Sequence, residues 1–179
     1  MLVVENTALV VIDVQEKLMR VMYQKEKLVD NLQRLIKGIQ VLGIPITVTE
    51  QYPKGLGVTI PEIAQLMPNV EPLPKLSFSC VGDEIFAGKV AATGRRQVLV
   101  CGIESHVCVY QTVRDLISAA YEVHIVTDAI SSRTPENKEI GLKMMNQIGA
   151  VLSSTETVLF ELLKIASGDK FKAISQIVK

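Results

Sequence analysis

The chain has 179 residues, of which 48% are hydrophobic and 21% charged, with 19 acidic and 19 basic side chains. This composition excludes an intrinsically disordered chain, and the formal net charge of zero gives no general attraction for nucleic acid or an anionic membrane surface. The length suits a single domain, and we expect residues 1–179 to form it.

The N-terminal stretch MLVVENTALVVIDVQ has no basic leader, and Glu5 and Asp13 interrupt its apolar residues. We therefore expect no signal peptide. No stretch approaches the roughly 18 apolar residues that a membrane helix needs, and three cysteines without paired spacing do not make a disulfide framework. These features predict an intracellular, cytoplasmic protein without a membrane partner. The nearest thing to a basic cluster, Arg95-Arg96, is too small to predict a nucleic-acid partner.

Short apolar runs rich in β-branched residues alternate with longer segments of helical periodicity. In chain order, the runs are ALVVID (Ala8 to Asp13), IPITVTE (Ile44 to Glu50), QVLVCGI (Gln97 to Ile103), EVHIVTD (Glu122 to Asp128) and GAVLSS (Gly149 to Ser154). Each run is nearly continuous in apolar character, which is typical of strands covered on both faces in a parallel sheet.

The segments between these runs carry the signals of amphipathic helices. One apolar stripe is followed by Gly43 and Pro45, which end a helix; it consists of Leu28, Leu32, Leu35, Ile36, Ile39 and Leu42. A second stripe follows Cys108 and consists of Val113, Leu116, Ile117 and Ala120. Thr134-Pro135-Glu136 predicts an N-cap and an acidic first turn. The sequence SSTE, Ser153 to Glu156, predicts a capping box.

The segment from Gln51 to Val81 breaks the alternation, because it contains five prolines and two glycines. It predicts a long loop that acts as a lid or pocket wall, with a short strand near Glu71 to Leu76. With that strand counted third, the chain predicts an α/β protein. We expect a three-layer, Rossmann-like fold: an open parallel sheet of order 3-2-1-4-5-6 with helices on both faces.

Two reactive side chains follow neighbouring strands of this expected sheet. Ligands of open parallel sheets bind beyond the carboxyl ends of the strands, where the strand order reverses. Asp13 ends the first strand, and Cys108 follows the QVLVCGI strand by a few residues. We therefore expect both side chains to project into one crevice.

Cys108 has two interpretations. Ser105 could cap a helix that holds Cys108 in its first turn, where unpaired amides and the helix dipole would lower the thiol pKa to roughly 3.5–7.5. The alternative is a small buried hydrophobic residue, the usual state of a free cysteine. Asp13 either caps a local turn or takes part in acid–base chemistry, since a lone carboxylate is costly to desolvate there. Lys75 taken alone predicts no more than a solvated surface charge.

Four other residues are weaker candidates. His106 lies two positions before Cys108, and residues so spaced on a helix point in different directions, which disfavours a Cys–His pair. His124 alternates within a strand and suits packing, Cys101 lies inside a strand, and Cys80 lies in the loop. No cluster has metal-ligand spacing and no glycine-rich nucleotide motif occurs, so we expect neither a metal nor a cofactor.

Four motifs in order resemble the isochorismatase-like cysteine hydrolases: ALVVIDVQEKL, PLPKLSFS, GIESHVCV and VTDAISSR, within a match from about Ala8 to Phe160. The stretches DVQEKL and TEQYPKGLG are most similar to the isochorismatase-domain-containing proteins. The resemblance implies a catalytic triad of Asp13, Lys75 and Cys108. Cys108 would attack a carbonyl carbon, Asp13 would take and return the proton, and Lys75 would hold both charges electrostatically.

The resemblance also maps a non-proline cis peptide onto Ile103–Glu104. That bond would aim the amide of Glu104, with that of Cys108, at the developing oxyanion. Together with Glu104, the residues that we expect to line the substrate pocket are Gln15, Leu18, Tyr52, Phe78 and Ser105.

Two departures from related patterns narrow the expected reaction. Nicotinamidase-type members carry an Asp-x-His metal site after the second strand, where this chain has Glu50-Gln51-Tyr52. Members that act on isochorismate itself manage without the cysteine, whereas Cys108 is present. The resemblance therefore implies a metal-independent hydrolase that cleaves a C–N, amide-type bond of a small molecule through a thioester acyl-enzyme. The alternative is a non-catalytic binding or scaffold protein that retains the fold and an ordinary thiol.

The C-terminal stretch GDKFKAISQIVK predicts a last helix, with Asp169 as its cap and an apolar stripe of Phe171, Ile174, Ile177 and Val178. This stripe must cover either its own domain or a neighbouring subunit. The family resemblance implies dimers and larger rings, so we expect a closed homo-oligomer, at least a dimer.

Overall fold

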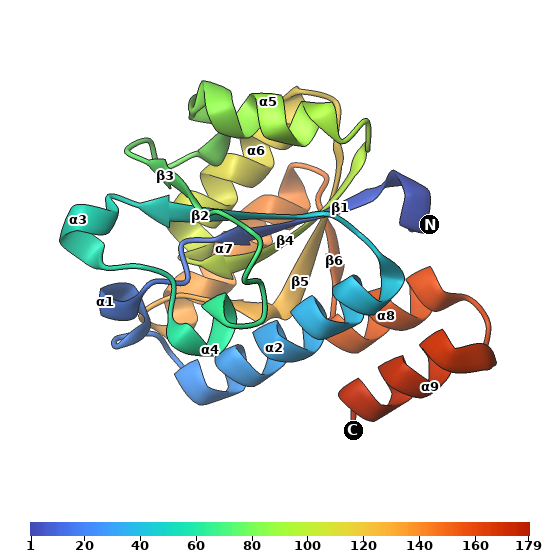
Figure 1. The fold of residues 1–179 in the computed structure, drawn as a ribbon. Helices are drawn as coiled ribbons and strands as arrows, with labels where there is room; N and C mark the ends of the chain where they lie inside the picture. The colour runs from blue at the N-terminus through green and yellow to red at the C-terminus, as the bar shows by residue number, and fades with distance from the viewer.

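The computed structural model describes residues 1–179, and a six-stranded sheet forms its middle layer (Figure 1). The strands are β1 (Thr7–Ile12), β2 (Ile46–Gln51), β3 (Leu73–Lys75), β4 (Gln97–Ile103), β5 (Glu122–Ser131) and β6 (Val151–Ser153). Their order is β3-β2-β1-β4-β5-β6, and every neighbouring pair is parallel. The α/β class and the strand order predicted from the sequence are confirmed.

The helices cover both faces of the sheet. They are α1 (Glu16–Met19), α2 (Lys25–Leu42), α3 (Pro53–Leu56), α4 (Pro61–Ala64), α5 (Glu84–Ala92), α6 (Tyr110–Ser118), α7 (Pro135–Gln147), α8 (Thr155–Leu163) and α9 (Gly168–Ile177). Helices α2, α8 and α9 lie on one face, and α5, α6 and α7 lie on the other (Figure 1). No helix combines the length and the apolar character needed to cross a membrane.

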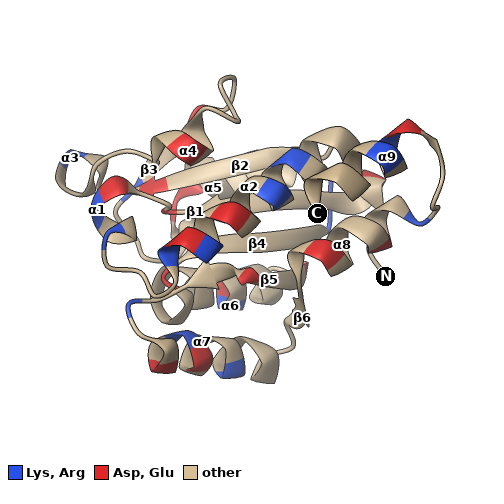
Figure 2. Ribbon diagram, turned by 90° about the horizontal axis from the view of Figure 1, so that it is seen from below, with Lys and Arg blue, Asp and Glu red and all other residues tan.

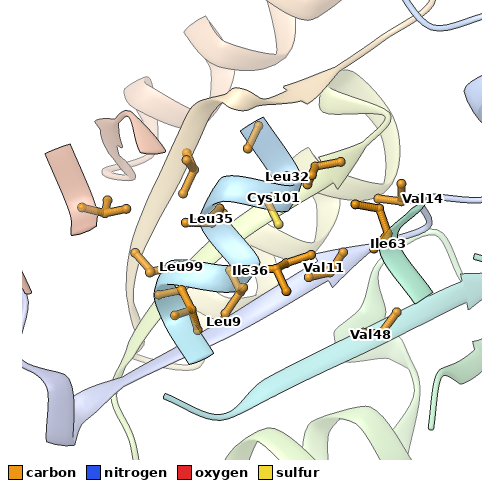
Figure 3. Close-up of a cluster of buried hydrophobic side chains, with 14 of the residues drawn as sticks. Leu9, Val11, Val14, Leu32, Leu35, Ile36, Val48, Ile63, Leu99 and Cys101 are labelled. Carbon is orange, nitrogen blue, oxygen red and sulfur yellow. The ribbon is translucent and has the colours of Figure 1, made fainter. Parts of the chain in front are cut away.

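The two faces of the central strands bury different side chains. In β1, Leu9 and Val11 join the core under α2, whereas Val10 and Ile12 join the core under α5, α6 and α7. Figure 3 shows Leu9 and Val11 in the first of these cores, with Leu35 and other α2 residues. Because successive side chains of a strand point to opposite faces, a strand covered on both faces needs apolar residues throughout. This requirement explains the continuous apolar runs in the sequence.

The ends of the helices confirm some predicted caps and correct others. Gly43 ends α2 in the left-handed conformation, and the Thr134 hydroxyl accepts a hydrogen bond from the Asn137 amide at the start of α7. The cap of α8 is Ser154 rather than Ser153, so the predicted capping box is one residue out of register. Ser167, not Asp169, precedes α9.

The apolar stripe of α9 packs on its own chain. The Ile174 side chain is completely buried in the core beneath α2, and Val178 packs against the same core. Helix α9 contacts both α2 and α8, and Figure 2 shows it beside these two helices. Two of the four stripe residues, Ile174 and Val178, therefore cover the protein's own domain, whereas Phe171 and Ile177 are half-buried.

We predict that Ile174→Ala lowers the free energy of unfolding by about 2–5 kcal/mol, because the substitution leaves a cavity between α9 and α2. The matched control is Ile165→Ala in the connection before α9, where the side chain is 66% exposed and the expected change is within about 0.5 kcal/mol. Urea unfolding of both variants gives the comparison. Equal effects at the two positions would show that α9 does not contribute to the core.

Candidate active site

The three residues of the expected triad come from three places at the carboxyl-end edge of the sheet. Asp13 directly follows β1, Lys75 is the last residue of β3, and Cys108 lies in a π-helical turn, Ser105–Val109, between β4 and α6. Strand β2 separates β1 from β3, yet the Lys75 side chain spans this distance and its Nζ lies 2.7 Å from Asp13 Oδ2. The Cys108 thiol is close enough for both charges to affect its pKa.

The Asp13 carboxylate is held on both oxygens. Asp13 has a φ of 53°, a left-handed conformation that aspartate tolerates better than most side chains. This turn ends β1 and leaves the carboxylate completely buried. Its Oδ1 accepts a hydrogen bond of 2.8 Å from the Thr49 hydroxyl, and its Oδ2 accepts the bond from Lys75.

The Lys75 ammonium group is surrounded by oxygen acceptors. Besides Asp13, its Nζ donates to Gln51 Oε1 at 2.7 Å and to the carbonyl oxygens of Ser77 and Phe78 at 3.2 Å each. Burial by itself lowers the pKa of Lys75. The attraction and hydrogen bond of Asp13, together with the charges that Cys80 and Cys108 carry when ionised, outweigh burial, so the pKa lies above its usual value. Lys75 is therefore a permanently charged partner of Asp13 at neutral pH.

The Cys108 thiol is protonated at rest. Cys108 is only 7% exposed. Burial is the larger cause and the nearby Asp13 carboxylate the second; together they raise the thiol pKa to about 12, although Lys75 acts in the opposite direction. The predicted low pKa is therefore wrong. The prediction considered the local helix terminus but not the desolvation of a thiolate beside a carboxylate, which is the larger effect here.

The turn that carries Cys108 also differs from the predicted helix start. Its first residue is Ser105, preceded by Glu104, and no side chain caps it. The Ser105 hydroxyl instead donates to the Ser131 carbonyl oxygen at 2.9 Å. The peptide bond between Ile103 and Glu104 is cis, at the place where β4 ends and the turn begins.

The residues expected to line the substrate pocket occupy different environments. Gln15 is completely buried, and its amide group bonds to the backbone of Gln51 and Gly57, so it braces the β2 end instead of facing a cavity. Ser105 is also completely buried. Tyr52 and Phe78 are exposed, whereas Leu18 packs against the core under α2. Tyr52 and Lys75 line an open cavity of about 530 Å³ that continues along Leu76 and Ser77.

The sequence did not single out two further residues that contact the triad, Thr49 and Gln51, and it ranked Cys80, which lies next to Thr49, only as a weak candidate. Thr49 and Gln51 bind Asp13 and Lys75 as described, and the Cys80 Sγ lies 3.7 Å from Thr49 Oγ1. Burial raises the pKa of Cys80 to about 11. The sequence feature that could have identified Thr49 and Gln51 is their position at the carboxyl end of β2, the strand next to β1. Cys80 follows a loop whose path has no comparable signal.

The weaker candidates are engaged elsewhere. His106 Nδ1 lies 3.0 Å from Ser132 Oγ, and His124 Nε2 lies 2.8 Å from Glu122 Oε1. Cys101 is completely buried in β4, and burial raises its pKa. Glu50 is also buried, and its Oε1 accepts bonds from the amide and the hydroxyl of Thr59. None of these side chains contacts Asp13 or Lys75.

We predict that iodoacetamide labels native Cys108 about ten times faster for each pH unit between pH 7 and pH 10, because the thiolate fraction of a thiol with a pKa of about 12 rises in that proportion. Mass spectrometry of the labelled peptide measures the rate. The urea-unfolded chain is the control, and its rate should level off near the ordinary thiol pKa of about 8.5. A plateau in the native protein below pH 8 would contradict the raised pKa.

Known proteins share both the sequence and the fold of this chain. An isochorismatase domain model matches residues 7–157. Isochorismatase domain-containing protein 2 of Danio rerio is 36% identical over 97% of this chain and 87% of its own length. The secreted isochorismatase effector Isc1 of Phytophthora sojae is 35% identical over 99% of this chain and 87% of its own length.

Solved structures agree with this relationship. The MAR1 ribonuclease of Caenorhabditis elegans superimposes with a TM-score of 0.93 at 34% identity, covering 99% of this chain and 91% of that one. The YcaC protein of Escherichia coli, described as an octameric hydrolase of unknown specificity, has a TM-score of 0.93 at 23% identity, covering 98% of this chain and 88% of that one. The domain match spans most of the sequence, and the chain therefore belongs to the isochorismatase family.

Proposed function

We propose that the protein is a metal-independent cysteine hydrolase that cleaves a C–N, amide-type bond of a small molecule. The observation that carries this proposal is the Cys108 thiol beside a completely buried carboxylate, Asp13, which is itself paired with Lys75 at 2.7 Å. A buried acid–base pair next to a nucleophile at a switch point of the sheet suits covalent catalysis. The isochorismatase-like hydrolase fold supports the same reaction class.

The raised thiol pKa determines the order of the steps. Because Cys108 is a thiol at rest, Asp13 must act as a general base, taking the Sγ proton as the S–C bond to the substrate carbonyl forms. The Lys75 ammonium group, 2.7 Å from Asp13 Oδ2, would balance the negative charge of the base until that moment. The carbonyl oxygen becomes an oxyanion, which the amides of Glu104 and Cys108 would stabilise.

The remaining steps return the enzyme to its starting state. Asp13 gives its proton to the leaving nitrogen, the C–N bond breaks, and a thioester with Cys108 remains. A water molecule then attacks the thioester carbon, with Asp13 taking the water proton. The C–S bond breaks, the acid product leaves, and the Cys108 thiolate recovers the proton from Asp13. The cycle consumes one water and needs no cofactor.

The surroundings of the triad favour a small substrate with an apolar portion. Tyr52 and Phe78 are the exposed aromatic residues among the expected lining residues. An open cavity of about 530 Å³ is lined by Tyr52 and Lys75 but by neither Asp13 nor Cys108, so it adjoins the triad. The size is that of a small-molecule site. We propose that Tyr52 and Phe78, with the half-buried Leu18, contact the apolar portion while the amide carbonyl reaches Cys108.

RNA is a weaker substrate candidate, although one similar structure is named a ribonuclease. Lysines and arginines alternate with acidic residues over the helices in Figure 2, whereas RNA binding favours a continuous basic face. Arg95 bonds to the carbonyl oxygens of Val4 and Thr7, and Arg96 lies over the Tyr121 ring. RNA nevertheless belongs in the substrate panel as a comparison.

The decisive experiment is a turnover screen of small amides, carbamates and a short RNA. We predict that Cys108→Ala lowers kcat on any amide substrate at least about a thousandfold, because the acyl-enzyme cannot form. Cys101→Ala is the matched control, since it also removes a buried thiol but one away from the triad, and it should retain activity. Mass spectrometry of the quenched wild-type enzyme should show an acyl adduct on Cys108.

Two outcomes of this screen would contradict the proposal. Undiminished turnover by Cys108→Ala would exclude the nucleophile. The absence of turnover and of any adduct in the wild type would favour a non-catalytic binding or scaffold protein, which ligand-induced stabilisation by the same compounds would then reveal.

We further propose a closed homo-oligomer, at least a dimer. The similar YcaC structure is described as octameric, and the chain exposes four large apolar side chains between residues 52 and 85: Tyr52, Leu76, Phe78 and Ile85. We predict a mass of at least twice 19.7 kDa in light scattering at micromolar concentration. A mass of one chain would contradict the proposal.

We also propose that the protein works in the cytoplasm, where its three free, buried thiols would stay reduced. One similar protein is named a secreted effector, so fractionation of the source cells is the measurement that decides the compartment.

A further inference from the structure

Three consecutive side chains at the nucleophile turn bind three consecutive residues at the end of β5. The Glu104 carboxylate accepts bonds from Arg133 Nε at 3.1 Å and from the Arg133 amide at 3.3 Å. The Ser105 hydroxyl donates to the Ser131 carbonyl oxygen at 2.9 Å, and His106 Nδ1 lies 3.0 Å from Ser132 Oγ. We call Ser131, Ser132 and Arg133 the β5 clamp.

The β5 clamp is itself anchored on rigid structure. Ser131 is the last residue of β5 and pairs with Ile103 of β4, next to the cis bond. Its hydroxyl donates to the Tyr23 carbonyl oxygen at 2.7 Å, and the Tyr23 amide donates to the Ser132 carbonyl oxygen at 2.9 Å. Ser131 and Ser132 are buried. The contacts to the turn therefore originate from a fixed strand end.

Helix α7 packs directly against the backbone of the turn. A Cβ atom at Gly141 of α7 would lie 2.7 Å from the Ser105 carbonyl carbon and oxygen and 2.8 Å from the His106 nitrogen. Only glycine allows this approach of a helix to the backbone of the turn. The turn is thus held by side-chain bonds from the β5 clamp and by direct packing on α7.

The Glu104–Arg133 pair contributes little to stability. The Arg133 side chain is 58% exposed, and ion pairs so exposed contribute on the order of 0–1 kcal/mol. However, Glu104 places a carboxylate beside the amide that would stabilise the oxyanion, and an uncompensated negative charge there opposes the reaction. Arg133 both neutralises this carboxylate and fixes its backbone.

We propose that Ser132 and Arg133 are positioning residues, which hold Glu104–His106 so that the amides of Glu104 and Cys108 keep a fixed orientation relative to the Cys108 sulfur. The catalytic consequence rests on the proposed hydrolase function, whereas the ordering of the turn does not. Reacting groups must keep their geometry to within about 0.5 Å, and small misplacements reduce rates by up to about 100-fold.

The test compares Arg133→Ala, Arg133→Lys and Ser132→Ala with wild type. Arg114→Ala is the matched control, because Arg114 Nε also binds a carboxylate, Asp115 at 2.8 Å, and its side chain is 48% exposed. Three quantities are measured: amide hydrogen exchange of the peptide 103–109, the pH 8 alkylation rate of Cys108, and kcat and KM on any substrate found. Urea unfolding reports global stability.

For Arg133→Ala we expect amide hydrogen exchange in peptide 103–109 to be at least about fivefold faster and the alkylation rate of Cys108 to change. We also expect kcat to be about tenfold lower and KM to stay within about twofold of wild type, which is the pattern for a group that acts in the transition state. Ser132→Ala should show the same pattern more weakly. Arg133→Lys should restore part of kcat, and Arg114→Ala should match wild type. Global stability should change by less than about 1 kcal/mol in Arg133→Ala.

The outcomes separate the clamp from the proposed function. If both Arg133→Ala and Ser132→Ala leave the amide hydrogen exchange of peptide 103–109 and the alkylation rate of Cys108 unchanged, the β5 clamp does not order the turn, regardless of the kinetic results. Faster exchange with unchanged kcat would overturn the positioning role. If the wild type turns over no substrate, the hydrolase proposal fails, and the exchange and alkylation rates still decide whether the β5 clamp orders the turn.

Discussion

Two opposite charges, the Asp13 carboxylate and the Lys75 ammonium group, lie 2.7 Å apart, with side chains 0% and 1% exposed. Removing both charges from water costs several kcal/mol per ion, and their attraction compensates only when further hydrogen bonds satisfy the remaining donors and acceptors. Here Thr49, Gln51 and two backbone carbonyl groups supply those bonds. The rest of the site is arranged so that this pair can exist.

The requirements of the pair explain several features of the fold. Strand β2 lies between the strands that carry the two charges, and its polar carboxyl end supplies a hydroxyl to one charge and an amide oxygen to the other. The chain after β3 turns back so that the carbonyl groups of Ser77 and Phe78 face Lys75. Gln15 in turn fixes the β2 end through its buried amide. The proline-rich segment between Gln51 and Val81 thus lines the buried ion pair of Asp13 and Lys75.

The sequence predicted the sheet well because apolar periodicity follows directly from burial on two faces. It predicted Gln97 to Ile103 as a strand, and β4 has those bounds; it ended the fifth strand at Asp128, whereas β5 continues to Ser131. The extension was missed because the charged Asp128 interrupts the apolar run. Its carboxylate accepts bonds from the amide and hydroxyl of the distant Thr155, contacts that no local pattern reveals.

The sequence predicted only part of the site, because contacts between segments far apart in the chain determine the rest. The positions of Asp13 and Cys108 follow from where strands end, and the family resemblance supplied Lys75. The ionisation of Cys108 depends on burial by segments far apart in the chain, so the local helix-terminus argument gave the wrong direction. Thr49 and Gln51 resemble ordinary polar residues of a strand, and only the strand order makes them partners of the two charges.

The protonated state of Cys108 has a consequence for the protein's chemical durability. Peroxides and disulfides react with thiolates far faster than with thiols, and the products of repeated oxidation are irreversible. A thiol with a pKa of about 12 has almost no thiolate at neutral pH and is thereby shielded from oxidants. In the proposed mechanism, the Cys108 thiolate would form only as a bound carbonyl group accepts the electron pair. The sulfur would then react with a bound ligand and stay unreactive toward its surroundings.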